Sequence, residues 1–173
     1  MALICCIVEI YLNIYHTGFL MSKAHTVIHG LDELKKAEYK TAEYYNSAAT
    51  TADQHSLADH AIVYRSIKAA HDSLALQIEG RKEELEKEDG EGLVEELLEN
   101  VVDALRAFVA DLPTLFVQRE TEPTPSVLKG LEHELIGQYQ KLVDLADQTT
   151  KEMLNSAIAS GKEHVDALEQ MHG

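Results

Sequence analysis

The 173-residue chain lacks tryptophan, contains three prolines, and has two cysteines that are adjacent, Cys5 and Cys6. Neighbouring cysteines rarely pair with each other and no third one is present, so a disulfide framework is excluded and a reducing, cytoplasmic location is expected. Proline is scarce while Ala, Leu, Glu and Lys are common, a composition that favours helices over strands. No long segment alternates in the strand pattern. The sequence therefore predicts an all-α protein.

Basic residues are also few, and the formal net charge is −15. Such a charge repels phosphate groups, which argues against nucleic acid and against an anionic membrane surface as partners. Attraction of cations is conceivable, although an acidic solvated surface is the more ordinary explanation. The chain also has no Gly-rich phosphate loop, no nucleophile elbow and no cysteine-pair zinc motif.

Residues 2–20 are apolar and contain neither Lys nor Arg, so they lack the basic region of a secretory signal. They are long enough to span a membrane, but Glu9, Asn13 and His16 would lie inside the span. The composition changes at Met21. Three interpretations stay open: residues 1–20 are a start-site artefact or unimportant extension, an additional packed helix or strand, or a membrane anchor. Residues 21–173 are predicted to form one helical domain.

Apolar residues recur at helical spacing through the rest of the chain, and Gly90, Gly92 and Pro113 are expected to end or kink helices. The pattern predicts helices over about 31–52, 56–88, 92–112, 126–148 and 150–171. Short connections join the first two and the last two helices, which predicts two helical hairpins. About forty residues separate the hairpins and carry the middle helix as a crossover.

An internal repeat relates the two hairpins. The pattern L-K-x-x-E at 34–38 returns at 128–132, Tyr45 matches Tyr139, and A-D-Q at 52–54 returns at 146–148. The offset is 94 throughout, without a gap. We therefore expect segments 34–54 and 128–148 to be related by an approximate twofold axis in one four-helix bundle.

Each repeated segment carries one acid on its inward, otherwise apolar stripe, Glu38 in the first and Glu132 in the second. A buried carboxylate costs several kcal/mol unless something pairs with it. The helices over 56–88 and 150–171 turn His71 and His164 inward at matching levels. We therefore predict that four residues converge on the bundle axis as metal ligands, namely Glu38, His71, Glu132 and His164. Carboxylate and imidazole suit iron, manganese or zinc.

A metal-free arrangement is the alternative. Lys68 lies one turn from His71 and could neutralise Glu38, while Glu132 could pair with His164. Tyr45 and Tyr139 lie two turns from the acids on the same stripes. They are expected to pack in the core, and the alternatives are a redox role or a hydrogen bond to a carboxylate.

The repeat, the crossover and one Glu plus one His per hairpin make residues 31–172 resemble the ferritin-like superfamily, especially its small bacterial members of unknown function. The resemblance implies a ferritin-like four-helix bundle with an extra helix in the crossover, and an iron or manganese site. Di-iron members carry Glu-x-x-His on each second helix. Lys68 and Gly161 occupy those Glu positions here, which argues against di-iron enzyme chemistry.

Two functional hypotheses follow. One is a ferritin-like protein that binds iron or another divalent metal at a degenerate Glu/His site. The other is a non-catalytic, metal-free bundle acting as a structural or stress-related interaction protein. The apolar segment 92–117 further predicts a homodimer that uses it, while the competing interpretation is that this segment covers the bundle.

Overall fold

The structure is a computed structural model that describes residues 2–89, 99–117 and 124–171. Within these ranges the regular structure is entirely helical, as expected. Its elements, in chain order, are α1 (Ala2–Gln54), α2 (Ala58–Asp89), α3 (Glu99–Val117), α4 (Pro125–Val143) and α5 (Gln148–Gln170).

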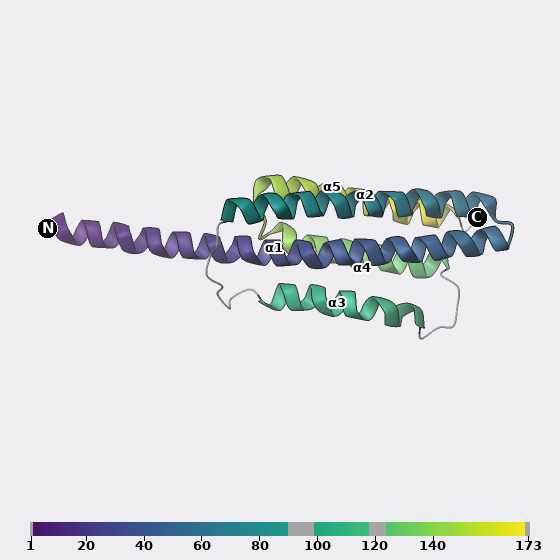
Figure 1. The fold of residues 1–173 in the computed structure, drawn as a ribbon, viewed down its shortest axis with the longest axis horizontal. Coiled ribbons are helices and arrows are strands. Elements are labelled where there is room, and N and C mark those ends of the chain that lie inside the picture. The colour runs from purple at the N-terminus through teal and green to yellow at the C-terminus, as the bar shows by residue number, and fades with distance from the viewer. Residues whose placement is uncertain (1, 90–98, 118–123, 172–173) are drawn as a thin grey trace.

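The helices lie side by side along one direction (Figure 1). Helices α1 and α2 form one antiparallel hairpin, and α4 and α5 form a second. Helix α3 runs beside α1 on the side away from α2 and α5, and it returns the chain along the length of the bundle (Figure 1). Because of this return, α4 runs in the same direction as α2 and antiparallel to α1.

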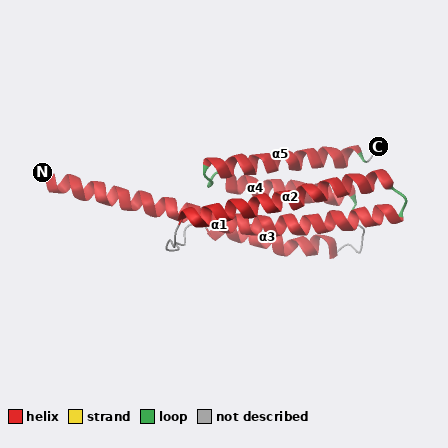
Figure 2. Cartoon of the chain, turned by 45° about the horizontal axis from the view of Figure 1, so that its top comes forward, coloured by secondary structure: helices red, strands yellow, loops and turns green. Residues whose placement is uncertain are grey.

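The first helix is much longer than predicted. It begins at Ala2 instead of residue 31, and its N-terminal part extends beyond the ends of the other helices (Figures 1 and 2). The change of composition at Met21 therefore does not interrupt the helix. Asp32 is the second residue of the helix predicted over 31–52, but it lies well inside α1, where its carboxylate pairs with Lys36 at 2.8 Å and Lys82 at 2.9 Å. Among the described helices, none combines the length and apolar composition that crossing a membrane requires.

Helix α3 was expected to end or kink at Pro113, but it continues to Val117. A proline inside a helix leaves the carbonyl four residues earlier without its usual donor. That carbonyl belongs to Val109, and it accepts a hydrogen bond from Nζ of Lys40 in α1 at 2.9 Å. A side chain of the neighbouring helix therefore replaces the missing N–H. Residues 92–98 of the predicted helix lie outside the described ranges.

Helix α4 ends five residues before its predicted end because Asp147 caps the next helix. The Asp147 carboxylate accepts from the backbone N–H of Thr150 at 3.0 Å, so the second A-D-Q segment lies at a turn. The first A-D-Q segment closes α1 instead. The repeat therefore describes the helix centres better than their ends.

The core has two apolar clusters. One contains Leu34, Ile78, Leu135 and Leu154, and the other contains Tyr45, Ile67, Leu128 and Leu168. On each of the four bundle helices, a polar residue falls between the two. These residues are Glu38, His71, Glu132 and His164.

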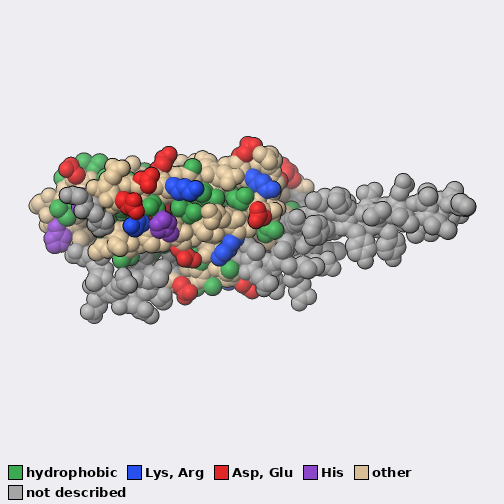
Figure 3. All heavy atoms as spheres, turned by 180° about the vertical axis from the view of Figure 1, so that it is seen from behind, with side chains coloured by type: hydrophobic (Ala, Val, Ile, Leu, Met, Phe, Trp, Pro, Cys, Tyr) green, Lys and Arg blue, Asp and Glu red, His purple; other side chains and the backbone are tan. Residues whose placement is uncertain are grey.

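Helix α3 belongs to the core in its described part. The buried apolar residues on it are Val102, Leu105, Phe108 and Val109. This arrangement agrees with the interpretation that α3 covers the bundle, whereas self-association stays a prediction. On the face opposite to Figure 1, acidic and basic side chains are interspersed with apolar ones (Figure 3).

Candidate metal centre

His71, in the middle of α2, lies between the two repeated acids. Its Nδ1 is 2.6 Å from Oε2 of Glu38, and its Nε2 is 2.9 Å from Oε1 of Glu132. All three side chains are almost completely buried. The predicted burial and convergence of Glu38, His71 and Glu132 are therefore seen in the structure.

The geometry of this group indicates which of its nitrogen atoms carry hydrogens. Both ring nitrogens of His71 face carboxylate oxygens, so with ionised acids both nitrogens must carry a hydrogen. Burial opposes the charged ring, but the charges of Glu38 and Glu132 and their hydrogen bonds outweigh it and raise the pKa of His71 to about 10. One imidazolium thus serves two carboxylates in this arrangement.

Two tyrosines complete the hydrogen bonding of the acids, and they do so reciprocally. The hydroxyl of Tyr45 in α1 donates to Oε1 of Glu132 in α4 at 2.7 Å, and Tyr139 in α4 donates to Oε1 of Glu38 in α1. Burial and the nearby carboxylates raise the pKa of both phenols, which keeps them protonated as donors. The hydrogen-bond interpretation of the tyrosines is therefore confirmed, and the exchange agrees with a twofold relation between the repeats.

The ring of Tyr45 also stacks on His71, with centroids 5.4 Å apart and planes inclined by 23°. This stacking fixes the plane of the imidazole, so the directions of its two nitrogens are set by packing as well as by hydrogen bonds.

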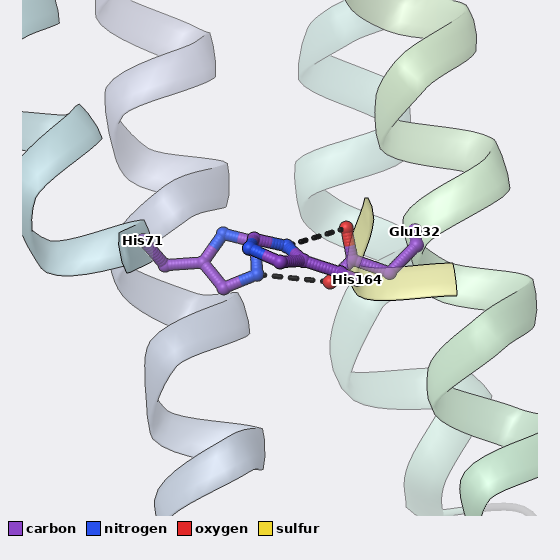
Figure 4. A group of neighbouring side chains, drawn as sticks. All are labelled: His71, Glu132 and His164. Carbon is purple, nitrogen blue, oxygen red and sulfur yellow. Dashed lines mark hydrogen bonds and ion pairs between the residues drawn. The ribbon is translucent and has the colours of Figure 1, made fainter. Parts of the chain in front are cut away.

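His164 of α5 reaches the same level from the other hairpin (Figure 4). Its ring lies 5.1 Å from that of His71, and its Nδ1 is 3.5 Å from Oε2 of Glu132. That distance is long for a hydrogen bond. Within the described residues, the buried Nδ1 has no hydrogen-bond partner. Nε2 of His164 lies 3.3 Å from Oγ of Ser160. The inward stripes did not predict this contact, although the two residues are one helical turn apart.

Glu132 has three polar partners in the site, which are Tyr45, His71 and His164. Burial alone would raise the pKa of its carboxyl, but the close approach of His164, the hydrogen bond with His71 and the charges of both rings lower it to about 2. The carboxylate is therefore ionised at neutral pH and carries two possible donor oxygens for a cation.

Three of the four predicted ligands form a group with metal-binding spacing. One donor atom each from His71, Glu132 and His164 lies within 4.8 Å of the others. Ligands about 2.1 Å from a common ion are ~3–4 Å apart, so binding requires only a small contraction. The unpartnered Nδ1 of His164 fits such an ion. Glu38 lies outside this group and holds the opposite nitrogen of His71.

The two positions that differ from the di-iron pattern do not contribute to the site. Lys68 pairs with Asp72, so the predicted Lys68–Glu38 pair was wrong. A Cβ on Gly161 would lie 2.9 Å from Cγ1 of Ile136, so this close approach leaves little room for a side chain. Across the described ranges, no other group of three possible ligands is found.

Comparisons of the chain with models of protein families, with curated proteins and with solved structures give no match. The resemblance to ferritin-like proteins therefore rests on the residues and their arrangement.

Proposed function

We propose that this chain is a ferritin-like helical-bundle protein that binds one divalent transition-metal ion at His71, Glu132 and His164. The observation that carries the proposal is the buried Nδ1 of His164, which has no hydrogen-bond partner among the described residues and lies beside an ionised carboxylate. Two imidazoles and one carboxylate suit iron(II), manganese(II) or zinc(II).

The path of the chain supports the ferritin-like part of the proposal. A crossover containing α3 lets α4 run parallel to α2, which is the connection that distinguishes ferritin-like bundles from simple up-and-down ones. The reciprocal contacts of Tyr45 with Glu132 and of Tyr139 with Glu38 support descent from a duplicated hairpin.

Glu38 has a supporting role in this proposal. Ligand histidines usually donate their second N–H to a carboxylate, which fixes the ring and raises its basicity. Glu38 accepts from Nδ1 of His71 in this way and leaves Nε2 directed toward Glu132. A metal held here would take the place of the Nε2 proton of His71, which would be released to solvent, while Nδ1 would stay hydrogen-bonded to Glu38.

The second candidate is a metal-free bundle that acts through its surface as a structural or interaction protein. It is favoured by the fact that the imidazolium of His71 already satisfies both acids. The two candidates differ in what His164 does, because a metal-free core needs no ligand at this position.

Metal analysis distinguishes the candidates. Protein purified without a tag or chelator is expected to contain about one equivalent of iron, manganese or zinc. His164→Ala should lose this metal, and His133→Ala, which alters an exposed histidine next to Glu132, should retain it. Glu38→Gln should weaken binding by about 10- to 100-fold.

The metal proposal is wrong if the wild-type chain is folded, metal-free, and unchanged in melting temperature when each of the three ions is added. The metal-free candidate is wrong if the wild type shows a metal-dependent rise in melting temperature that His164→Ala abolishes.

A further inference from the structure

A second pair of histidines lies on α1, outside the polar layer of the core. His25 and His29 are four residues apart and therefore share one face of the helix. Their Nε2 atoms are 3.0 Å apart, with ring centroids 4.5 Å apart and ring planes inclined by 77°. Both donor atoms thus point toward one place at the surface of α1.

The separation of the two nitrogens indicates which metal geometry they suit. Imidazole nitrogens bind a metal at about 2.0–2.1 Å, so two of them 3.0 Å apart subtend an angle of roughly 90° at a shared ion. A tetrahedral ion would need them about 3.4 Å apart. Neighbouring positions of a square-planar or tetragonal ion match the pair better, and Cu(II) and Ni(II) have this preference with nitrogen ligands.

The surroundings of His29 favour the neutral form of its ring. Burial and the neighbouring His25 lower the pKa of His29, as does Arg106 from α3, while Asp32 and Glu33 oppose them. His29 is nevertheless exposed, so water can complete the coordination of an ion. Asp32 is held by Lys36 and Lys82, and Glu33 by Lys36.

We propose that His25 and His29 form a surface site for a divalent ion of tetragonal geometry, which binds Cu(II) most tightly and Ni(II) more weakly. The order follows the general affinity series of these ions. The site is separate from the core centre, because His29 precedes Glu38 by nine residues, or ~13 Å along the helix. It does not depend on whether the core binds a metal. In the metal-free chain, the two nitrogens share one hydrogen instead.

Occupation of the site joins two successive turns of α1 where the helix enters the bundle. Since the ion binds the helical arrangement of the two rings and not an unfolded one, it stabilises this part of α1.

Titration with Cu(II) tests the proposal on the full chain, with Cys5 and Cys6 alkylated because thiols reduce Cu(II). In His164→Ala, whose core site is disabled, electron paramagnetic resonance should show one axial Cu(II) ion with two nitrogen ligands. Adding His25→Ala or His29→Ala should weaken binding at least about tenfold, because the second ligand acts at a high effective concentration. Adding His133→Ala, which removes an exposed histidine away from this pair, should leave the affinity for Cu(II) unchanged.

The same comparison in the otherwise wild-type chain covers the case in which His164→Ala does not fold. There, His29→Ala should lower the number of tightly bound Cu(II) ions by one, and circular dichroism should show that the helices remain. Equal affinity and stoichiometry with and without His29 would overturn the proposal, as would a spectrum with a single nitrogen ligand.

Discussion

At the scale of single residues, the main feature is that one histidine ring is the ion-pair partner of two buried acids. The positive ring of His71 lies between Glu38 and Glu132, and each acid receives a further hydrogen bond from a tyrosine. Removing a partner from such a group leaves an uncompensated buried charge, which is far more costly than losing a surface ion pair.

This pairing predicts how the stability of the metal-free chain depends on pH. The folded pKa of His71, about 10, lies above its usual 6.5. The contribution of His71 to the free energy of unfolding is therefore complete below pH 6.5 and is lost as pH rises through 10. Glu132, at about 2 instead of 4.5, contributes above pH 4.5 and loses this contribution as pH falls through 2.

Urea unfolding with a chelator present checks this expectation. The free energy of unfolding should be highest between about pH 4.5 and 6.5 and should fall by on the order of a few kcal/mol by pH 10. His133→Gln should show the same profile, whereas His71→Gln should be less stable and should lose the decline specific to the alkaline side. A wild-type profile that stays flat from pH 6.5 to 10 would contradict the imidazolium assignment.

The tyrosines provide a second prediction. Tyr45→Phe or Tyr139→Phe removes a donor from a buried carboxylate and should destabilise the chain by about 1–3 kcal/mol. Tyr39→Phe, at a position 42% exposed, should change little. Thermal unfolding of the three variants would measure the effect, and similar values for all three would mean that the buried hydrogen bonds contribute nothing.

At the scale of the helices, α1 supplies the donor that allows α3 to continue through Pro113. Lys40→Met should destabilise the chain by about 1–2 kcal/mol because the Val109 carbonyl loses its partner. In a Pro113→Ala background the helix recovers its own N–H, so the same substitution should cost clearly less. A double-mutant cycle measures this coupling, and equal costs in both backgrounds would exclude the assigned role of Lys40.

The turn between α1 and α2 places Ser56 at a φ of 62°, where side chains are strained. Ser56→Gly should stabilise the chain by up to about 1 kcal/mol, since glycine adopts this conformation without strain. Ser66→Gly, at an exposed position inside α2, should instead destabilise it by about 0.5–1 kcal/mol. Denaturant unfolding of both variants should show opposite signs, and destabilisation by Ser56→Gly would refute the strain.

The helices themselves were predictable from apolar spacing, but their limits were not. Local signals such as Asp32 or Pro113 predict boundaries only when neighbouring helices do not intervene. Here Lys36 and Lys82 hold Asp32 inside a helix, and Lys40 satisfies the carbonyl freed by Pro113. Two of these contacts, Lys82 with Asp32 and Lys40 with Val109, join residues tens of positions apart, and helical periodicity does not contain that information.

At the scale of the whole molecule, α3 is part of the core. Phe108 is buried beside α1, so Phe108→Glu should lower the stability of a single chain by at least about 3 kcal/mol. Its melting temperature should fall equally at low and high protein concentration. Light scattering at both concentrations gives the oligomeric state. A dimer that dissociates with unchanged monomer stability would show that Phe108 acts at an interface instead.

The site was partly predictable because an acid on an apolar stripe is conspicuous, and both acids are buried as expected. The reciprocal hydrogen bonds, in which the tyrosine of each repeat donates to the acid of the other, could have been predicted as well. Each tyrosine follows its acid by seven residues, so an antiparallel arrangement that sets Glu38 opposite Tyr139 also sets Tyr45 opposite Glu132. The unequal roles of His71 and His164 were not predictable. In the 94-residue repeat His164 corresponds to Ala70 and not to His71, and this one-residue difference decides which ring reaches both acids.

The polar layer between the two apolar clusters also determines how the helices align lengthwise. Stripes of Ala and Leu would tolerate sliding by one turn, because apolar contacts are not directional. A slip of α1 along α4 would separate Glu38 from Tyr139 and Tyr45 from Glu132 at the same moment. Both acids would then lose hydrogen-bond partners in a dry interior, so the polar layer favours a single register of α1 against α4.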